Sequence, residues 1–171
     1  GATWSATTLA GGTWSYSINT TSFPDGSKTF QVRSTDNAGN QSTVSHTLLV
    51  DNTPPTSSHS IAGTMGNNGY YVTAPVVTIS ATDATSGVAS RTFDGANYTA
   101  PVTISTQGTT SHTYFATDAA GNNSTTGSFT IKVDTVAPSA AISSHTSNQP
   151  VRGTISLGGS VSDATSGVSL V

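Results

Sequence analysis

The chain has 171 residues, of which only 8% are charged, and it carries a formal net charge of −3 and no cysteine. The lack of cysteine excludes a disulfide framework, a thiolate metal site and a cysteine nucleophile, and the five scattered lysines and arginines exclude a basic surface for nucleic acid. Ser, Thr, Gly and Asn, which fill many positions, disfavour helix interiors, so we expect an all-β protein.

Apolar runs along the chain are far shorter than the ~18 residues that a membrane helix needs. Residues 1–30 contain no basic segment followed by an apolar one, so we expect neither a signal peptide nor membrane insertion of this segment. β-branched and aromatic residues recur in short alternating runs, which favour folded strands over disorder.

Sequence segments return at a period of about 80 residues. The pairs are "STDNAGNQS" at 34–42 with "ATDAAGNNS" at 116–124, "LLVDNTPPT" at 48–56 with "IKVDTVAPS" at 131–139, and "DATSGV" at 83–88 and 163–168. A period of this size is typical of one small β-sandwich and not of a solenoid coil.

The order of these segments divides the chain into three predicted parts. Residues 54–136 contain each segment once and form a complete unit, whereas residues 1–53 match the later part of a unit and residues 137–171 match the opening of another. Two interpretations follow. The chain is a section of a longer tandem array, or its end parts complete the units of like subunits by strand addition and build a head-to-tail filament.

The first part is expected to be in register with the complete unit. Phe30, Val32 and Ser34 correspond to His112, Tyr114 and Ala116, and His46, Leu48 and Val50 correspond to Phe129, Ile131 and Val133. His46 and His112 then lie on apolar faces, where packing is the expected role. His59 and His145 fall in Ser-rich loops or at strand starts, and no two histidines have a metal-ligand spacing.

Residues 54–136 predict about seven short strands separated by turn residues, the pattern of a Greek-key sandwich. Asn68-Gly69 is a tight-turn signal. In 74–83, Val77, Ile79 and Ala81 alternate with polar residues, so one face of this strand is expected to be buried. The remaining predicted strands lie at 89–93, 98–105, 111–118 and 128–134.

The motifs "GTWSYS", "STDNAGN", "VDNTPP", "ATDAAGN" and "VDTVAP" resemble the bacterial immunoglobulin-like (Ig-like) repeats of long surface adhesins and other secreted proteins. The resemblance covers nearly the whole chain and implies tandem Ig-like Greek-key β-sandwiches, one complete and two partial. It also implies a stalk or spacer outside the cell, at the cell surface or in a secreted fibre, with calcium at domain junctions. Proteins of this type often lack cysteine.

The recurring aspartates fit such junctions. In an Ig-like sandwich, the loop after the second strand and the loop between the last two strands lie at the same end as the incoming linker. Asp83, Asp118 and Asp51 occupy these three places, so their carboxylates are expected to converge. A hard cation such as Ca²⁺, which prefers six to eight oxygens, would neutralise them, with Asn52, Asn122 or backbone carbonyls as further ligands.

The same scheme places the other recurring aspartates. Asp134 and Asp163 would form the next calcium junction together with a further loop, and Asp36 belongs to a junction preceding residue 1. The alternative hypothesis is that all of these residues only form turns by bonding their own backbone. Asp25 and Asp94, each followed by glycine, are expected to be turn formers in either case.

An enzyme is the least supported class, because the sequence lacks Glu, a G-x-S-x-G motif and a Ser, His and Asp set that the strands would bring together. We expect a non-catalytic extracellular stalk or filament whose partners are neighbouring Ig-like units, with host or environmental glycans bound by other regions. A carbohydrate-binding accessory module is the other alternative, because aromatic rings stack on sugars. Its candidates are Trp4, Trp14, Tyr16, Tyr70, Tyr71, Tyr98 and Phe115.

Overall fold

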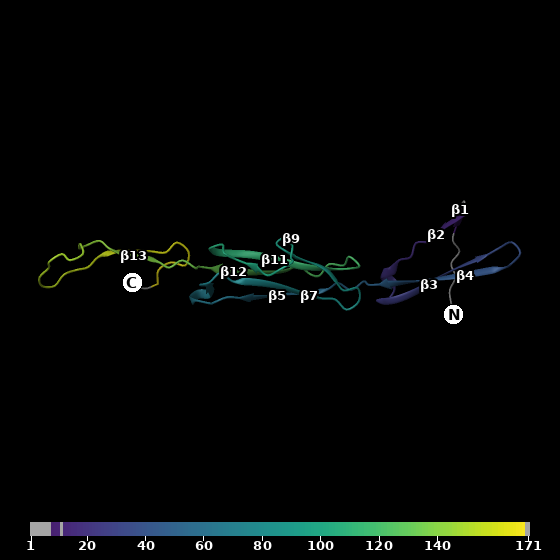
Figure 1. Ribbon diagram of the computed structural model, residues 1–171, viewed down its shortest axis with the longest axis horizontal. Helices are drawn as coiled ribbons and strands as arrows, with labels where there is room; N and C mark the ends of the chain where they lie inside the picture. The colour runs from purple at the N-terminus through teal and green to yellow at the C-terminus, as the bar shows by residue number, and fades with distance from the viewer. Residues whose placement is uncertain (1–7, 11, 170–171) are drawn as a thin grey trace.

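A computed structural model describes residues 8–10 and 12–169 (Figure 1). The described residues form strands and two short 3₁₀ turns, η1 (Thr20–Ser22) and η2 (Asn67–Gly69), with no α-helix among them. The strands of the outer parts are β1 (Thr8–Ala10), β2 (Thr13–Ser15), β3 (Gly26–Thr35), β4 (Gln41–Val50), β13 (Ser139–Ile142) and β14 (Gly159–Ser162). The all-β prediction is confirmed.

Two sheets packed face to face form the middle of the molecule. Their strands are β5 (Thr56–Ala62), β6 (Tyr70–Tyr71), β7 (Val76–Thr82), β8 (Val88–Phe93), β9 (Ala96–Asn97), β10 (Val102–Thr103), β11 (Gly108–Asp118) and β12 (Gly127–Val133). The first sheet has the order β10-β7-β5 and the second β6-β12-β11-β8-β9, and the pairs are antiparallel except β12 with β6. This is the Ig-like sandwich that the strand pattern predicts.

The core of this sandwich comes from the alternation along its strands. Val77 and Ile79 of β7 and Val133 of β12 are fully buried, because every second residue of a strand points to the same face. The cluster consists of Val77, Ile79, Phe93, Tyr98, Ile104, Tyr114, Ile131 and Val133. Burying apolar side chains of this kind is worth about 1.5–3 kcal/mol each, so the interior of the sandwich is its main source of stability.

The turns and strand ends of the central sandwich mostly follow the local sequence. Asp94 and Gly95, with φ of 48° and 79°, turn the chain between β8 and β9, which confirms the turn predicted there. The strand predicted at 98–105 is wrong for most of its length, since only Val102–Thr103 pairs with β7. Pro101 has no N–H to donate, and the N–H of Tyr98 bonds instead to the carbonyl of Arg91 at 2.7 Å.

The position expected for His59 is also wrong. His59 lies in the middle of β5, where its ring stacks on Phe129 with centroids 4.3 Å apart and its Nδ1 lies 3.0 Å from the Tyr114 hydroxyl. Ser57, His59 and Ile61 are the half-buried positions of this strand. β5 therefore alternates like the other strands, with polar residues at two of its three inward positions.

The β3–β4 hairpin has the same internal register as the β11–β12 hairpin, which confirms the predicted correspondence. β3 pairs with β4 so that Phe30 faces His46 and Gly26 faces Val50, and β11 pairs with β12 so that His112 faces Phe129 and Gly108 faces Val133. β13 and β14 pair antiparallel, as β5 and β7 do.

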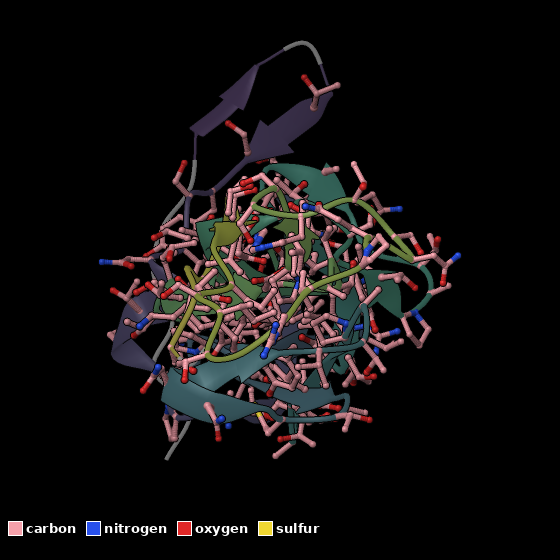
Figure 2. All side chains as sticks on the ribbon, turned by 90° about the vertical axis from the view of Figure 1, so that its left-hand side faces the viewer. Atoms are coloured by element: carbon pink, nitrogen blue, oxygen red, sulfur yellow. The ribbon has the colours of Figure 1, made fainter. Side chains whose placement is uncertain are left out.

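The elements follow one another along one long axis, with β3–β4 at one end, the two sheets in the middle and β13–β14 at the other (Figure 1). Viewed along this axis, the β1–β2 hairpin, in purple, stands out from the rest of the molecule (Figure 2). Within the described residues, no helix is long and apolar enough to cross a membrane.

Candidate functional site

Three carboxylates meet where the linker after β4 enters the central sandwich. Asp51 follows β4, Asp83 follows β7 and Asp118 is the last residue of β11. One carboxylate oxygen from each lies within 4.8 Å of the others, and Asp51 and Asp118 are only 8% and 2% exposed. The chain topology thus brings together residues that lie up to 67 positions apart in sequence. We call this group the junction cluster.

The loop after β7 is wrapped around one oxygen of Asp83. Its Oδ1 accepts the N–H groups of Thr85, Ser86 and Gly87 at 3.1, 3.0 and 2.7 Å. Gly87 adopts a φ of 81°, which allows three successive N–H groups to converge on one acceptor. Among the described residues, no hydrogen bond reaches Oδ2 of Asp83, so this oxygen is available to a further ligand.

The linker is held by the same loop. Oδ2 of Asp51 accepts the N–H of Ser86 at 3.0 Å, and its Oδ1 accepts the N–H of Thr53 at 3.1 Å. Ser86 therefore donates to carboxylates on both sides of the junction, from a single N–H. A bond of this kind to a charged acceptor contributes about 1.5–3 kcal/mol, so it restrains the angle between linker and sandwich.

Asp118 closes a second loop. Its Oδ1 and Oδ2 accept the backbone and side-chain N–H groups of Asn122, both at 2.8 Å, and Nδ2 of Asn122 also donates to the carbonyl of Asp51 at 3.0 Å. Burial raises the pKa of Asp118, but the hydrogen bonds from the side chain and backbone of Asn122 and from Gly121 and Ala120 outweigh it and hold this pKa below its ordinary value. The carboxylate therefore stays charged at neutral pH.

Asp25 is a junction residue that the sequence analysis missed. Its Oδ1 accepts the N–H of Asn52 at 2.7 Å, its Oδ2 accepts the Thr53 hydroxyl, and these bonds hold its pKa below the ordinary value, the Thr53 bond most. At the next linker, Gln107 occupies the position equivalent to Asp25, and its Oε1 accepts the N–H of Thr135 at 2.9 Å. The missed signal is the spacing, because Asp25 and Gln107 both precede a glycine and are 82 residues apart.

The second linker repeats the bonds of the first. Oδ1 of Asp163 accepts the N–H groups of Thr165, Ser166 and Gly167 at 3.0, 2.8 and 2.8 Å. Oδ2 of Asp134 accepts the N–H of Ser166 at 3.0 Å, as Asp51 accepts that of Ser86. The two junctions therefore share one geometry.

Asp36 lies apart from both of these groups. Its loop is equivalent to that of Asp118. Oδ1 and Oδ2 of Asp36 accept the backbone and side-chain N–H groups of Asn40, both at 2.8 Å. The side-chain bond to Asn40 is the largest of the effects that lower the pKa of Asp36. Of the six aspartates singled out as metal ligands, three share the junction cluster, Asp134 and Asp163 share the second linker, and Asp36 is linked to neither.

The junction cluster has the donor chemistry of a hard-cation site. It offers carboxylate oxygens from a linker and two loops, and within the described part of the chain no lysine or arginine lies at ion-pair distance from these three aspartates. Three close negative charges repel one another unless a cation is present, and Ca²⁺ is bound by carboxylate and carbonyl oxygens. The residues fit this ion.

The comparison with known families agrees with the fold. Residues 1–52 match the family model described as a bacterial Ig-like domain. The match supports a bacterial Ig-like domain in this part of the chain. Domains of this family are typically non-enzymatic and often exposed at the surface. Among curated proteins, none matches the chain.

A hydrogen-bonded set of Thr, His and Asp links β11 to the β8–β9 turn, with the Asp94 side chain 41% exposed. Nδ1 of His112 lies 2.6 Å from Oδ2 of Asp94, and its Nε2 lies 2.8 Å from the Thr110 hydroxyl. Because an ionised carboxylate only accepts hydrogen bonds, Nδ1 of His112 is the donor to Asp94. The ring is buried and stacks on Phe93 at 5.3 Å, so the set fixes the β8–β9 turn to β11, consistent with a non-catalytic domain.

The aromatic candidates for sugar binding are spread over the molecule. Trp14 and Tyr16, each 52% exposed, belong to the first part, and Tyr98 is buried in the central core. Tyr70 has Lys132 over its ring at 5.5 Å, Tyr70, Tyr71 and Phe115 are half-buried, and Trp4 lies outside the described residues. These positions do not favour the carbohydrate-binding alternative.

Proposed function

We propose that this chain is a section of a rod of Ig-like units outside a bacterial cell, a non-catalytic stalk or fibre of a surface protein. The observation that carries the proposal is the recurrence of one set of hydrogen bonds at two successive linkers, Ser86 with Asp51 and Ser166 with Asp134. A flexible spacer would not need hydrogen bonds that tie each linker to a loop of the next unit. Each unit would hold the next at a fixed angle, and ligand recognition would belong to other regions of the protein.

Prolines support the same mechanical role. Pro54 and Pro55 follow the first junction, and Pro138 follows the second. Proline fixes its own φ and restricts the residue before it, so each linker has little freedom even before its hydrogen bonds form. Pro55 is also buried, which anchors the first linker on the sandwich.

Calcium is the proposed ligand of the junction cluster. Asp51, Asp83 and Asp118 would supply its carboxylate oxygens, with Oδ2 of Asp83 as the oxygen that no other group occupies. Asp134 and Asp163 would be part of an equivalent site, and Asp36 of another. Extracellular modules bind Ca²⁺ at ~10⁻⁴–10⁻³ M, so these sites would be filled outside the cell, where calcium is abundant.

Thermal unfolding of the full chain in millimolar Ca²⁺ and in chelator tests this proposal. We expect Ca²⁺ to raise the melting temperature by a few degrees, since a ligand that binds only the folded state stabilises it by mass action. The double variant Asp83→Asn, Asp118→Asn should lose the part of this shift that belongs to the central sandwich, and the matched variant Asp163→Asn at the other linker should keep that part. Identical curves in calcium and chelator would eliminate the cation and leave the linker bonds as the only clamp.

Small-angle scattering of the same samples tests the rod. The maximum dimension should be that of an extended particle, and it should change little between calcium and chelator if the hydrogen bonds at Asp51 and Asp134 already set the angles. A broad distribution of dimensions, typical of units joined by free hinges, would contradict the rod whatever the calcium result.

A further inference from the structure

The side-chain hydroxyl of Ser86 is a buried polar group without a partner. Its Oγ has less than 1 Å² of exposed surface, and among the described residues no hydrogen bond reaches it. The other such atom in the described part of the chain is the hydroxyl oxygen of Tyr98, a residue of the apolar core. Ser86 lies instead in the loop after β7, at the first linker. Buried hydroxyls normally have a hydrogen-bond partner, so this one requires an explanation.

Ser86 contacts two carboxylates of the junction cluster through its backbone. Its N–H donates to Oδ1 of Asp83 and to Oδ2 of Asp51, both at 3.0 Å. The hydroxyl belongs to the same residue as this nitrogen, so it lies next to the cluster, although it bonds to neither carboxylate. The unpartnered oxygen is therefore found where a cation would be held.

The equivalent serine of the second linker shows which way a hydroxyl at this position points. The N–H of Ser166 makes the same two bonds, to Asp163 and Asp134. Its Oγ lies 3.4 Å from Oδ1 of Asp163, so the hydroxyl faces the carboxylate of its own loop. At the first linker this contact is absent, although the backbone bonds are the same.

Oδ2 of Asp83 is a second oxygen without a partner in the same loop. Among the described residues no hydrogen bond reaches it, whereas Oδ1 accepts three N–H groups. A serine hydroxyl can rotate, and a carboxylate is a strong acceptor, so a hydroxyl that served only the loop would donate to this oxygen. Both oxygens instead keep their lone pairs free. A hard cation, which is bound by neutral as well as charged oxygens, would satisfy both at once.

We infer that the hydroxyl oxygen of Ser86 is a further ligand of the cation at the junction cluster. The inference rests on the proposed function, because it requires that this cluster holds Ca²⁺. Several carboxylate oxygens of the cluster already accept hydrogen bonds, whereas Ca²⁺ prefers six to eight oxygens. A hydroxyl adds an oxygen without adding negative charge to three carboxylates that repel one another. Ser86 then joins the linker to the loop twice, through its N–H and through the ion.

Calcium titration of the full chain, followed by two-dimensional NMR, tests the inference at this linker alone. The amide signal of Gly87 reports on the loop itself, because its N–H donates to Asp83. Ser86→Ala should weaken the calcium affinity read from this signal by about tenfold or more, since even a group that only supports a metal ligand contributes that much. The matched control is Thr85→Ala, which keeps its backbone bond to Asp83 and should bind calcium like the wild type.

The stability of Ser86→Ala without calcium separates a metal ligand from a structural group. A hydroxyl whose partner is the ion contributes nothing in chelator, and its removal eliminates a buried polar group without a partner. The variant should therefore melt at or above the wild-type temperature in chelator and gain less than the wild type from millimolar Ca²⁺. A lower melting temperature in chelator, together with an unchanged calcium affinity, would show that the hydroxyl only supports the loop and would overturn the inference.

A thiol at the same position tests direct contact with the ion. The chain has no cysteine, so Ser86→Cys introduces a single thiol. Thiolates prefer soft ions and carboxylates hard ones, so this variant should bind Ca²⁺ more weakly than the wild type. With Cd²⁺ it should show the ultraviolet charge-transfer absorption of a thiolate–metal bond. Ala84→Cys, at an exposed position of the same loop, should lack this absorption at equal Cd²⁺. Equal absorption from both variants would contradict direct contact.

The wild-type titration separates this inference from the proposed calcium site. If the Gly87 signal of the wild type does not respond to Ca²⁺, the junction cluster holds no ion, and the calcium proposal and the inference both fail. If the signal responds and Ser86→Ala binds calcium with the wild-type affinity, the calcium proposal stands and the inference is overturned.

Discussion

The backbone N–H of Ser86 lies 3.0 Å from Oδ2 of Asp51, a residue that precedes it by 35 positions. Ser86 also donates to Asp83 of its own loop at 3.0 Å. One N–H therefore links the end of the β3–β4 hairpin to the loop after β7 of the central sandwich. Because the donor belongs to the backbone, no substitution of Ser86 other than proline would remove it, and the bond depends on the carboxylates that accept it.

Asn122→Ala should loosen the first junction without unfolding the sandwich. The variant loses the bonds from Nδ2 to the Asp51 carbonyl and to Asp118, which together contribute about 1–3 kcal/mol. We expect a broader distribution of dimensions in small-angle scattering and a melting temperature lower by a few degrees. The control is Asn123→Ala, which loses a bond to Thr117 at 2.6 Å but no contact with the linker. Equal scattering from both variants would show that the Asn122 bond does not fix the angle.

Stability should fall in acid because of the lowered pKa values of Asp118 and Asp163. For Asp163, the hydrogen bond from the Gly167 N–H makes the largest contribution to the lowered pKa. For Asp118, burial raises the pKa, but several hydrogen bonds together lower it by more. A carboxyl group with a lower pKa in the folded state contributes stability above the unfolded value of about 3.9, and this contribution is lost as pH falls through the folded pKa.

The wild type in chelator should therefore have a nearly constant melting temperature from about pH 7 to 5 and lose stability below about pH 4. Asp118→Asn should melt lower near neutral pH and depend less on pH in the acid range, because it has one titrating group fewer. Calorimetry across this range is the measurement. A variant whose melting temperature falls as steeply as that of the wild type would show that Asp118 does not contribute to acid unfolding.

Several features of the molecule could be predicted from sequence because they depend on alternation and spacing. The pairing of Phe30 with His46 follows from a hydrophobic pattern that returns 82 and 83 residues later. The meeting of Asp51, Asp83 and Asp118 follows from sandwich topology. In both cases a shift of one residue in the pairing of the strands would turn the side chains to the opposite face of the sheet. The sequence pattern therefore specifies the register strongly.

The features that were missed depend on contacts with no local pattern. Asp25 precedes a glycine, which is an ordinary turn signal, whereas its partner Asn52 lies 27 positions away. The sequence around His59 predicts a loop or a strand start, because β5 is mostly Ser and Thr. Its inward position is stabilised by stacking on Phe129, a residue whose proximity only the folded chain reveals.

Asp25→Asn should keep the bonds of the first linker but weaken them. The bonds from the Thr53 hydroxyl and the Asn52 N–H lower the pKa of Asp25 by more than the charge of Asp118 raises it, so the charged carboxylate is the favoured form. The amide oxygen can still accept the N–H of Asn52, and its NH₂ group can donate to Thr53, as Gln107 does to Thr135 at 3.0 Å. In chelator we expect a melting temperature slightly below that of the wild type, because the bonds lose a charged acceptor, and Asp25→Ala, which loses both bonds, should melt lower still. A loss of stability in Asp25→Asn equal to that in Asp25→Ala would mean that the charge itself is needed.

Gly127→Ala should destabilise the central sandwich by steric conflict. A Cβ at this position would lie 2.3 Å from Cζ of Tyr114, directly across the β11–β12 pair. Tyr114 cannot move easily, because its hydroxyl is bonded to His59 and its ring packs on Phe129. We expect a loss of about 1–3 kcal/mol, the usual cost of overpacking, measured by urea unfolding. The neighbouring Ser128→Ala, at an exposed position, should change stability by less than about 0.5 kcal/mol. If both variants unfold at the same urea concentration, Tyr114 has another rotamer open to it and the contact with Gly127 does not constrain the sheet.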